Sequence, residues 1–173
     1  MKAVFFDRDG VLNRELGRYV VNADEFEVND WVASFMQVFK NAGYNFFVIT
    51  NQGGIAKELY THTDLFAIHK KLTDTLLPYN VTFTEIFYCS HHPLKSQCLC
   101  RKPDSLMLEK AIAKYGVEME KSFLIGDTDR DINAAAKVGL AAYQVIPNHP
   151  LTTEQLQDLQ GLTAVDLQTL IAK

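Results

Sequence analysis

Short apolar segments alternate with amphipathic segments along most of this chain, and this alternation limits the fold more than any other feature. Residues 3–6 are uniformly apolar, which is typical of a strand buried on both faces of a parallel sheet. Similar runs predict further strands at 45–50, 86–88, 122–125 and 142–146. Strands that alternate with helices form a parallel sheet covered on both faces. The pattern therefore predicts a three-layer α/β fold.

The segments between these strands have the spacing of helices. Val32, Phe35, Met36 and Phe39 recur on one helical face, and Gly43 follows as a stop signal. The same reasoning predicts helices at 65–76, 108–115 and 129–138, and one or two surface helices in a C-terminal tail at 152–173.

Size and charge limit the functions that such a chain can have. Its 173 residues suit a single domain, 1–173. A net charge of −4 does not favour a nucleic acid or an anionic membrane as partner. No apolar stretch approaches the roughly 20 residues that span a bilayer, and the N-terminus lacks the apolar core of a signal peptide. We therefore expect a cytoplasmic monomer whose cysteines are thiols or metal ligands.

Polar side chains follow three of the predicted strands at the point where each strand ends. Asp7 and Asp9 follow the first strand, Thr50 and Asn51 end the second, and Asp127 follows the fourth. The carboxyl ends of parallel strands meet at one edge of the sheet, where ligands bind. We therefore expect these residues to lie close together.

This set of residues suits phosphoryl transfer. Asp7 can attack phosphorus as a nucleophile, and Asp9 can act as the acid and base. Neighbouring carboxylates recruit a hard cation such as Mg²⁺, for which Asp127 would be a further ligand. Thr50 and Lys102 would hold the phosphate oxygens. Taken singly, an Asp-x-Asp pair often caps a turn and a lysine is often solvated, so the order of the elements carries the interpretation.

That order resembles the haloacid dehalogenase (HAD) superfamily of phosphotransferases. The resemblance rests on FFDRDGVLN at 5–13, VITNQ at 48–52, CRKP at 100–103 and LIGDTDRDINAA at 124–135. It implies a Rossmann-like sheet with a minimal cap, and an aspartyl phosphate formed on Asp7. It implies that Mg²⁺ is bound by Asp7, the backbone carbonyl of Asp9, and Asp127. Asp131 either caps the helix at 129–138 or supports the metal.

All three cysteines of the chain, Cys89, Cys98 and Cys100, lie within a dozen residues and have two histidines among them. Three thiolates and one imidazole form a closed tetrahedral site for a structural Zn²⁺. His91 has the better spacing, and His92 is the alternative ligand. Free buried thiols, a disulfide and a redox site are the alternatives to zinc. A zinc loop at about 89–100 would direct the two cations that follow it, Arg101 and Lys102, toward the active site.

The combined motifs resemble the D-glycero-D-manno-heptose 1,7-bisphosphate 7-phosphatase family. The segment 51–57 (NQGGIAK) favours this family, whereas the short spacing from His91 to Cys98 is closer to the histidinol-phosphatase domain, and Thr128 stands where the heptose enzymes carry Lys. The resemblance implies a small phosphorylated sugar as substrate. Its implied contacts are Asn51, Gln52 and Arg101. Arg14, Arg18 and Lys57 are further candidates for a distal phosphate, although a solvated surface charge is the more common role of such residues.

Other classes of function remain as alternatives. A phosphoacceptor signalling domain also places Asp, Thr and Lys on such a sheet, but it does not need an acid at the position of Asp9. A zinc-ordered interaction module without catalysis is a further alternative, and the complete catalytic set argues against it.

Overall fold

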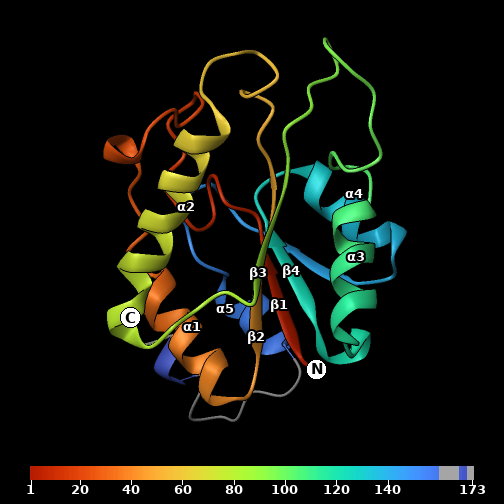
Figure 1. The fold of residues 1–173 in the computed structure, drawn as a ribbon. Helices are drawn as coiled ribbons and strands as arrows, with labels where there is room; N and C mark the ends of the chain where they lie inside the picture. The colour runs from red at the N-terminus through yellow and green to blue at the C-terminus, as the bar shows by residue number, and fades with distance from the viewer. Residues whose placement is uncertain (160–167, 171–173) are drawn as a thin grey trace.

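The computed structural model describes residues 1–159 and 168–170 of the chain. Five parallel strands form one sheet in the order β3-β2-β1-β4-β5 (Figure 1). The strands are β1 (Ala3–Phe6), β2 (Asn45–Asn51), β3 (Glu85–Cys89), β4 (Phe123–Gly126) and β5 (Ala141–Gln144). This sheet with helices on both faces confirms the predicted α/β fold class.

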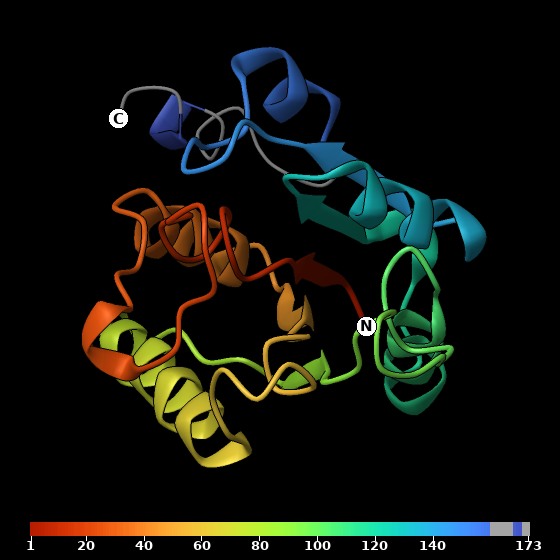
Figure 2. The ribbon, with the colours of Figure 1, turned by 90° about the horizontal axis from the view of Figure 1, so that it is seen from above.

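Helices cover both faces of the sheet. The view from above shows α1 (Val32–Asn41) and α2 (His62–Leu76) on one face and α3 (Leu106–Tyr115) and α4 (Asp129–Lys137) on the other (Figure 2). Short 3₁₀ turns lie at Ala23–Glu25, Leu77–Tyr79 and Met119–Lys121. The predicted C-terminal tail contributes α5 (Thr153–Asp158), and its residues 160–167 and 171–173 lie outside the described residues.

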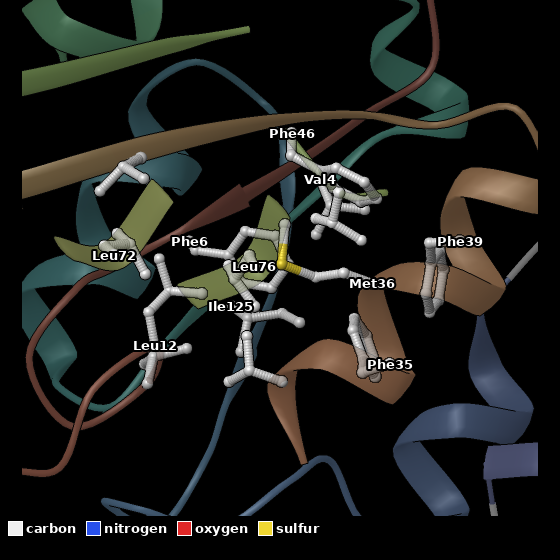
Figure 3. Close-up of a cluster of buried hydrophobic side chains, with 14 of the residues drawn as sticks. Val4, Phe6, Leu12, Phe35, Met36, Phe39, Phe46, Leu72, Leu76 and Ile125 are labelled. Carbon is white, nitrogen blue, oxygen red and sulfur yellow. The ribbon is translucent and has the colours of Figure 1, made fainter. Parts of the chain in front are cut away.

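Successive side chains of each strand enter different cores, because side chains of a strand point alternately to its two faces. Val4 and Phe6 pack under α1 and α2 (Figure 3). Ala3 and Phe5 pack under α3 and α4. Each fully buried side chain of the size of Val or Phe contributes roughly 1.5–3 kcal/mol relative to its exposed state. Two such layers hold the short strand β1 rigidly at the centre of the sheet.

Local signals in the sequence place the helix ends. Thr61 and Asp64 form a capping box at the start of α2, and α3 ends at Gly116, whose φ of +60° favours glycine. α3 begins at Leu106, and Lys102 lies in the preceding loop. Within the described residues, no helix combines the length and the apolar character needed to cross a bilayer.

The register of the central strands determines which loops meet. Phe6 of β1 pairs with Ile125 of β4, and the amide of Asp7 donates a hydrogen bond of 2.9 Å to the carbonyl of Ile125. β1 and β4 therefore end side by side. Asp7 and Asp127, which directly follow these strands, emerge at the same edge of the sheet.

Candidate active site and metal centres

A cavity of about 320 Å³ lies at the carboxyl edge of the sheet. It is lined by residues of the loops after β1, β2 and β4 and by the residues that follow the cysteine cluster. The sequence-predicted residues on its wall are Asp7, Asp9, Thr50, Asn51, Arg101, Lys102 and Asp127. Of the predicted catalytic and substrate-binding residues, Gln52 does not line it.

Lys102 is the centre of a buried charge cluster. Its Nζ lies 2.9 Å from Oδ1 of Asp7, forms an ion pair with Asp131, and donates a hydrogen bond of 2.7 Å to the carbonyl of Ile49. Only 2% of Lys102 is exposed. Burial works against the charged ammonium, but Asp7 and Asp131 outweigh it and raise the pKa of Lys102. Lys102 is thus held as a cation beside the candidate nucleophile.

Three carboxylates meet at the floor of the cavity. Asp7, Asp127 and Asp131 each offer an oxygen within 4.8 Å of the others. Burial, with Asp131 adding to it, raises the pKa of Asp7 to about 7 and that of Asp127 to about 6. In Asp7 this rise persists although Lys102 opposes it. Carboxylates that are costly to ionise together attract a cation, and their hard oxygens suit Mg²⁺.

Asp131 combines a capping role with a place in the charge cluster around Lys102. Its Oδ2 accepts hydrogen bonds from the amide of Thr128 at 3.1 Å and from the Thr128 hydroxyl at 2.6 Å, within the capping box of α4. Its other oxygen pairs with Lys102. Asp131 therefore joins the start of α4 to the residues around Asp7.

Asp9 is held by an arginine that the sequence motifs alone did not assign to the site. The Arg8 guanidinium donates to both oxygens of Asp9, at 2.7 and 2.8 Å from Nη2, and Asn13 donates at 3.1 Å. Burial tends to raise the pKa of Asp9, but Arg8, Gln52 and Asn13 outweigh it and hold this pKa below its ordinary value. Only 1% of Arg8 is exposed. Arg8 is the second residue after β1, and nothing in the sequence motif distinguishes it from a solvated loop charge.

Hydrogen bonds inside the protein hold the side chain of Gln52 in place. It is buried, and its Nε2 donates to Asp9 at 3.0 Å and to the Thr50 hydroxyl at 2.8 Å, while Tyr60 donates to its Oε1 at 2.6 Å. Both the nitrogen and the oxygen of this side chain are therefore engaged inside the protein. Gln52 therefore orients Asp9 and Thr50, and its predicted contact with substrate stays a prediction.

Asn51 links the second strand to the loop that carries Lys102. Its side chain donates to the carbonyl of Lys102 and accepts from the Lys102 amide, each at 3.0 Å. Arg101 donates from Nη1 to the carbonyl of His91 at 3.1 Å. Asn51 and Arg101 thus lie on the cavity wall and also organise the loop.

The cysteine cluster forms a second candidate metal centre. Cys89, His91, Cys98 and Cys100 each place a ligand atom within 4.8 Å of the others. The sulfur of Cys89 lies 3.7 Å from that of Cys98 and 3.2 Å from that of Cys100. Zn–S bonds of about 2.3 Å in a tetrahedron require sulfurs about 3.8 Å apart. The donor set and its spacing therefore fit Zn²⁺, and all three cysteines are free thiols.

The two histidines of this loop differ in their surroundings. Nδ1 of His91 lies 3.3 Å from the sulfur of Cys100 and 3.6 Å from that of Cys89. Nδ1 of His92 instead accepts a hydrogen bond of 3.2 Å from the Leu94 amide. The geometry therefore favours His91 as the fourth ligand.

Comparison with known proteins places this geometry among phosphatases. A HAD-hydrolase-like family model matches residues 99–148. The D-glycero-alpha-D-manno-heptose-1,7-bisphosphate 7-phosphatase of Photorhabdus laumondii is 32% identical over 87% of this chain and 85% of its own length. The D-glycero-beta-D-manno-heptose-1,7-bisphosphate 7-phosphatase of the same organism is 36% identical over 90% of this chain and 86% of its own length.

A solved structure extends the similarity to the whole fold. The D,D-heptose 1,7-bisphosphate phosphatase of B. bronchiseptica, solved with magnesium and phosphate, superposes with a TM-score of 0.82 at 30% identity. The match covers 100% of both chains. A HAD-like phosphatase of Mesorhizobium loti, at 24% identity and a TM-score of 0.80, shares the fold and is matched over 99% of this chain and 85% of its own.

The zinc centre makes the first testable prediction. We expect about one zinc per chain in the purified protein by elemental analysis, and loss of that zinc when Cys98→Ser and Cys100→Ser are combined, because two thiolate ligands disappear. His91→Ala should lower the zinc content, and His92→Ala is the matched control that should retain it. Zinc that survives His91→Ala and is lost in His92→Ala would reverse the ligand assignment.

Gly10 has no side chain, and the carboxylate of Asp127 occupies the space that a Cβ at this position would need. Its φ is +80°, and a Cβ built there would lie 2.1 Å from Oδ2 of Asp127. Gly10→Ala should displace this carboxylate and weaken Mg²⁺-dependent turnover by roughly tenfold or more, as expected for a misplaced reacting geometry.

Gly139→Ala is the control for this substitution. Gly139 has a similar φ of +72°, but a Cβ built there would have nothing within 4 Å of it. Both variants carry the cost of left-handed backbone, roughly 1–2 kcal/mol, and only Gly10→Ala should lose turnover. Equal effects of the two substitutions on turnover would show that the contact with Asp127 does not matter.

Proposed function

This chain belongs to the HAD-like phosphatase family of the D-glycero-D-manno-heptose-1,7-bisphosphate 7-phosphatases, and we propose that it removes the 7-phosphate from a heptose 1,7-bisphosphate. The observation that carries the proposal is the meeting of Asp7, Asp127 and Lys102 at one edge of the sheet, within a chain that matches these relatives over most of their length. The relatives named above include enzymes for both anomers, and either anomer is a candidate substrate.

In the proposed first step, a carboxylate oxygen of Asp7 attacks phosphorus. A bond forms between that oxygen and phosphorus, and the bond from phosphorus to the sugar oxygen breaks. Lys102, 2.9 Å from Asp7, and the Thr50 hydroxyl bind the transferring phosphoryl oxygens. The carboxylates of Asp7 and Asp127 and the backbone carbonyl of Asp9 would hold Mg²⁺. A cation held there would offset the repulsion between the anionic nucleophile and the anionic ester.

Asp9 supplies and removes the proton in this mechanism. The leaving sugar oxygen takes a proton from Asp9, and in the second step Asp9 takes a proton from the water that cleaves the aspartyl phosphate and releases inorganic phosphate. Arg8, Gln52 and Asn13 stabilise the ionised form that the second step needs. We propose that Asp9 turns from Arg8 toward the leaving oxygen when substrate binds, because its proton must reach that oxygen.

The zinc centre has a structural part in this proposal. Cys89, His91, Cys98 and Cys100 would fill the coordination sphere and leave no open position for chemistry. Their effect on catalysis is indirect, since Arg101 and Lys102 follow Cys100 without a break.

Two other functions remain as competitors. Hydrolysis of histidinol phosphate is favoured by the short spacing between His91 and Cys98. A phosphoacceptor signalling role would not use Asp9 as an acid.

We further propose a monomeric cytoplasmic enzyme without nucleic-acid or membrane partners, supported by the net charge of −4 and by the free thiols of the cysteine cluster.

Asp7→Asn tests the nucleophile and the substrate together. Turnover of both anomers of heptose 1,7-bisphosphate should fall by roughly a thousandfold or more, because the amide cannot attack phosphorus. Zinc content and thermal melting measure whether the fold is retained. Rates of the wild-type protein on heptose 7-phosphate and histidinol phosphate complete the comparison, and a preference for histidinol phosphate would overturn the proposed substrate.

The pKa values predict how Mg²⁺ binding changes with pH. Raised pKa values mean that Asp7 and Asp127 hold protons below about pH 7 and about pH 6 in the metal-free protein, and the cation must displace those protons. Apparent Mg²⁺ affinity should therefore fall as the pH decreases from about 8 to about 6, by up to roughly tenfold per pH unit for each proton displaced. Calorimetric titration with Mg²⁺ measures this, and an affinity that is constant over the range would contradict it.

A further inference from the structure

The catalytic cavity contains cations that already have carboxylate partners. Lys102 pairs with Asp7 and Asp131, as described above. Arg18 pairs with Glu25 at 2.7 Å. Each of these cations has a carboxylate partner, so a second phosphate would compete with that partner for the cation.

Two other cations on the same wall, Arg101 and Arg130, have no carboxylate partner among the described residues. The Arg101 guanidinium contacts a neutral group, the carbonyl of His91, at 3.1 Å. Arg130 is exposed, and no residue in the described part of the chain forms a hydrogen bond or ion pair with its side chain. An arginine stays charged at any physiological pH. Arg130 is therefore an uncompensated positive charge at the mouth of the catalytic cavity.

A second cavity, of about 640 Å³, adjoins the catalytic one. The two share Arg101, Lys102 and Arg130 as wall residues. Asp104 is the carboxylate on the described wall of the second cavity, and it pairs with Lys137 at 2.7 Å. This space between the zinc loop and α4 is therefore positively charged, in contrast to the acidic floor of the catalytic cavity.

The start of α4 presents Arg130 to this space. The capping box of Thr128 and Asp131 holds the first turn of the helix, and Arg130 lies within that turn. The partial positive charge of a helix N-terminus adds to the attraction for an anion there. Thr128 itself uses its hydroxyl to bind Asp131, and Arg130 is the cationic side chain of this turn.

The other arginine and lysine candidates for a distal phosphate are less well placed. Arg14 pairs with Glu27 at 3.4 Å and lines a separate cavity. Nζ of Lys57 lies over the ring of Tyr19, 5.3 Å from its centre. Neither Arg14 nor Lys57 lines the wall that the two cavities share.

We propose that Arg130, together with Arg101, binds the phosphate of the substrate that is not cleaved, in the cavity between α4 and the zinc loop. This inference rests on the proposed function, because it requires a substrate with two phosphates. A guanidinium binds phosphate through paired hydrogen bonds of defined direction. A monophosphate leaves this cavity without its anion, so Arg130 is a residue that selects bisphosphates.

The test compares kcat/KM for heptose 1,7-bisphosphate with kcat/KM for heptose 7-phosphate in the full chain with Mg²⁺. Arg130→Gln should lower the ratio of the two values by roughly tenfold to a hundredfold, as expected for loss of a charge-assisted contact. Arg130→Lys should restore part of the ratio. Arg14→Gln removes an exposed arginine elsewhere and should leave the ratio as in the wild type.

Combining Arg101→Gln with Arg130→Gln tests whether both side chains bind one phosphate. The double variant should lose less than the product of the two single losses, because groups that share a ligand are not independent. A ratio unchanged in Arg130→Gln, in a wild type that prefers the bisphosphate, would overturn this inference and leave the proposed function standing. A wild type without that preference would overturn both.

Discussion

The buried ammonium of Lys102 is the interaction on which the site depends. It contacts Asp7 after β1, Asp131 from α4 and the carbonyl of Ile49 from β2, so one charge joins three elements at the sheet edge. A buried lysine without carboxylates would be strongly destabilising, and carboxylates without the lysine would repel each other. The cluster is stable only when the strands and α4 are in register, which couples the catalytic geometry to the fold.

Much of this arrangement could be predicted from the sequence. The apolar runs at 3–6 and 122–125 indicated buried parallel strands, and the rule that the carboxyl ends of such strands meet brought Asp7 and Asp127 together. The grouping of Cys89, Cys98 and Cys100 indicated a metal site, because thiols in a reducing compartment seldom form a stable disulfide. These predictions depended on periodicity and on local spacing.

Other features of the site could not be predicted, because they depend on the direction in which side chains point. The order of residues in the sequence does not specify that direction. The motif did not show that the amide of Gln52 points inward and contacts Thr50 and Asp9. Nothing in the motif distinguished Arg8 from a solvated loop charge, and it is buried because Asp9 and Phe26 lie against its guanidinium. Arg130 was indistinguishable from any surface arginine until the cavity beside it was known.

The zinc loop consists of two parts with different constraints. Its exposed turn at 93–97 carries none of the four proposed ligands, whereas Cys100 stands only two residues before Lys102. Natural insertions and deletions can therefore accumulate within the turn without shifting Lys102, but a single residue gained or lost after Cys100 would displace this lysine. For protein engineering, this turn is a place to graft new recognition segments beside the cavity, while the four proposed metal ligands keep the loop before Lys102 in place.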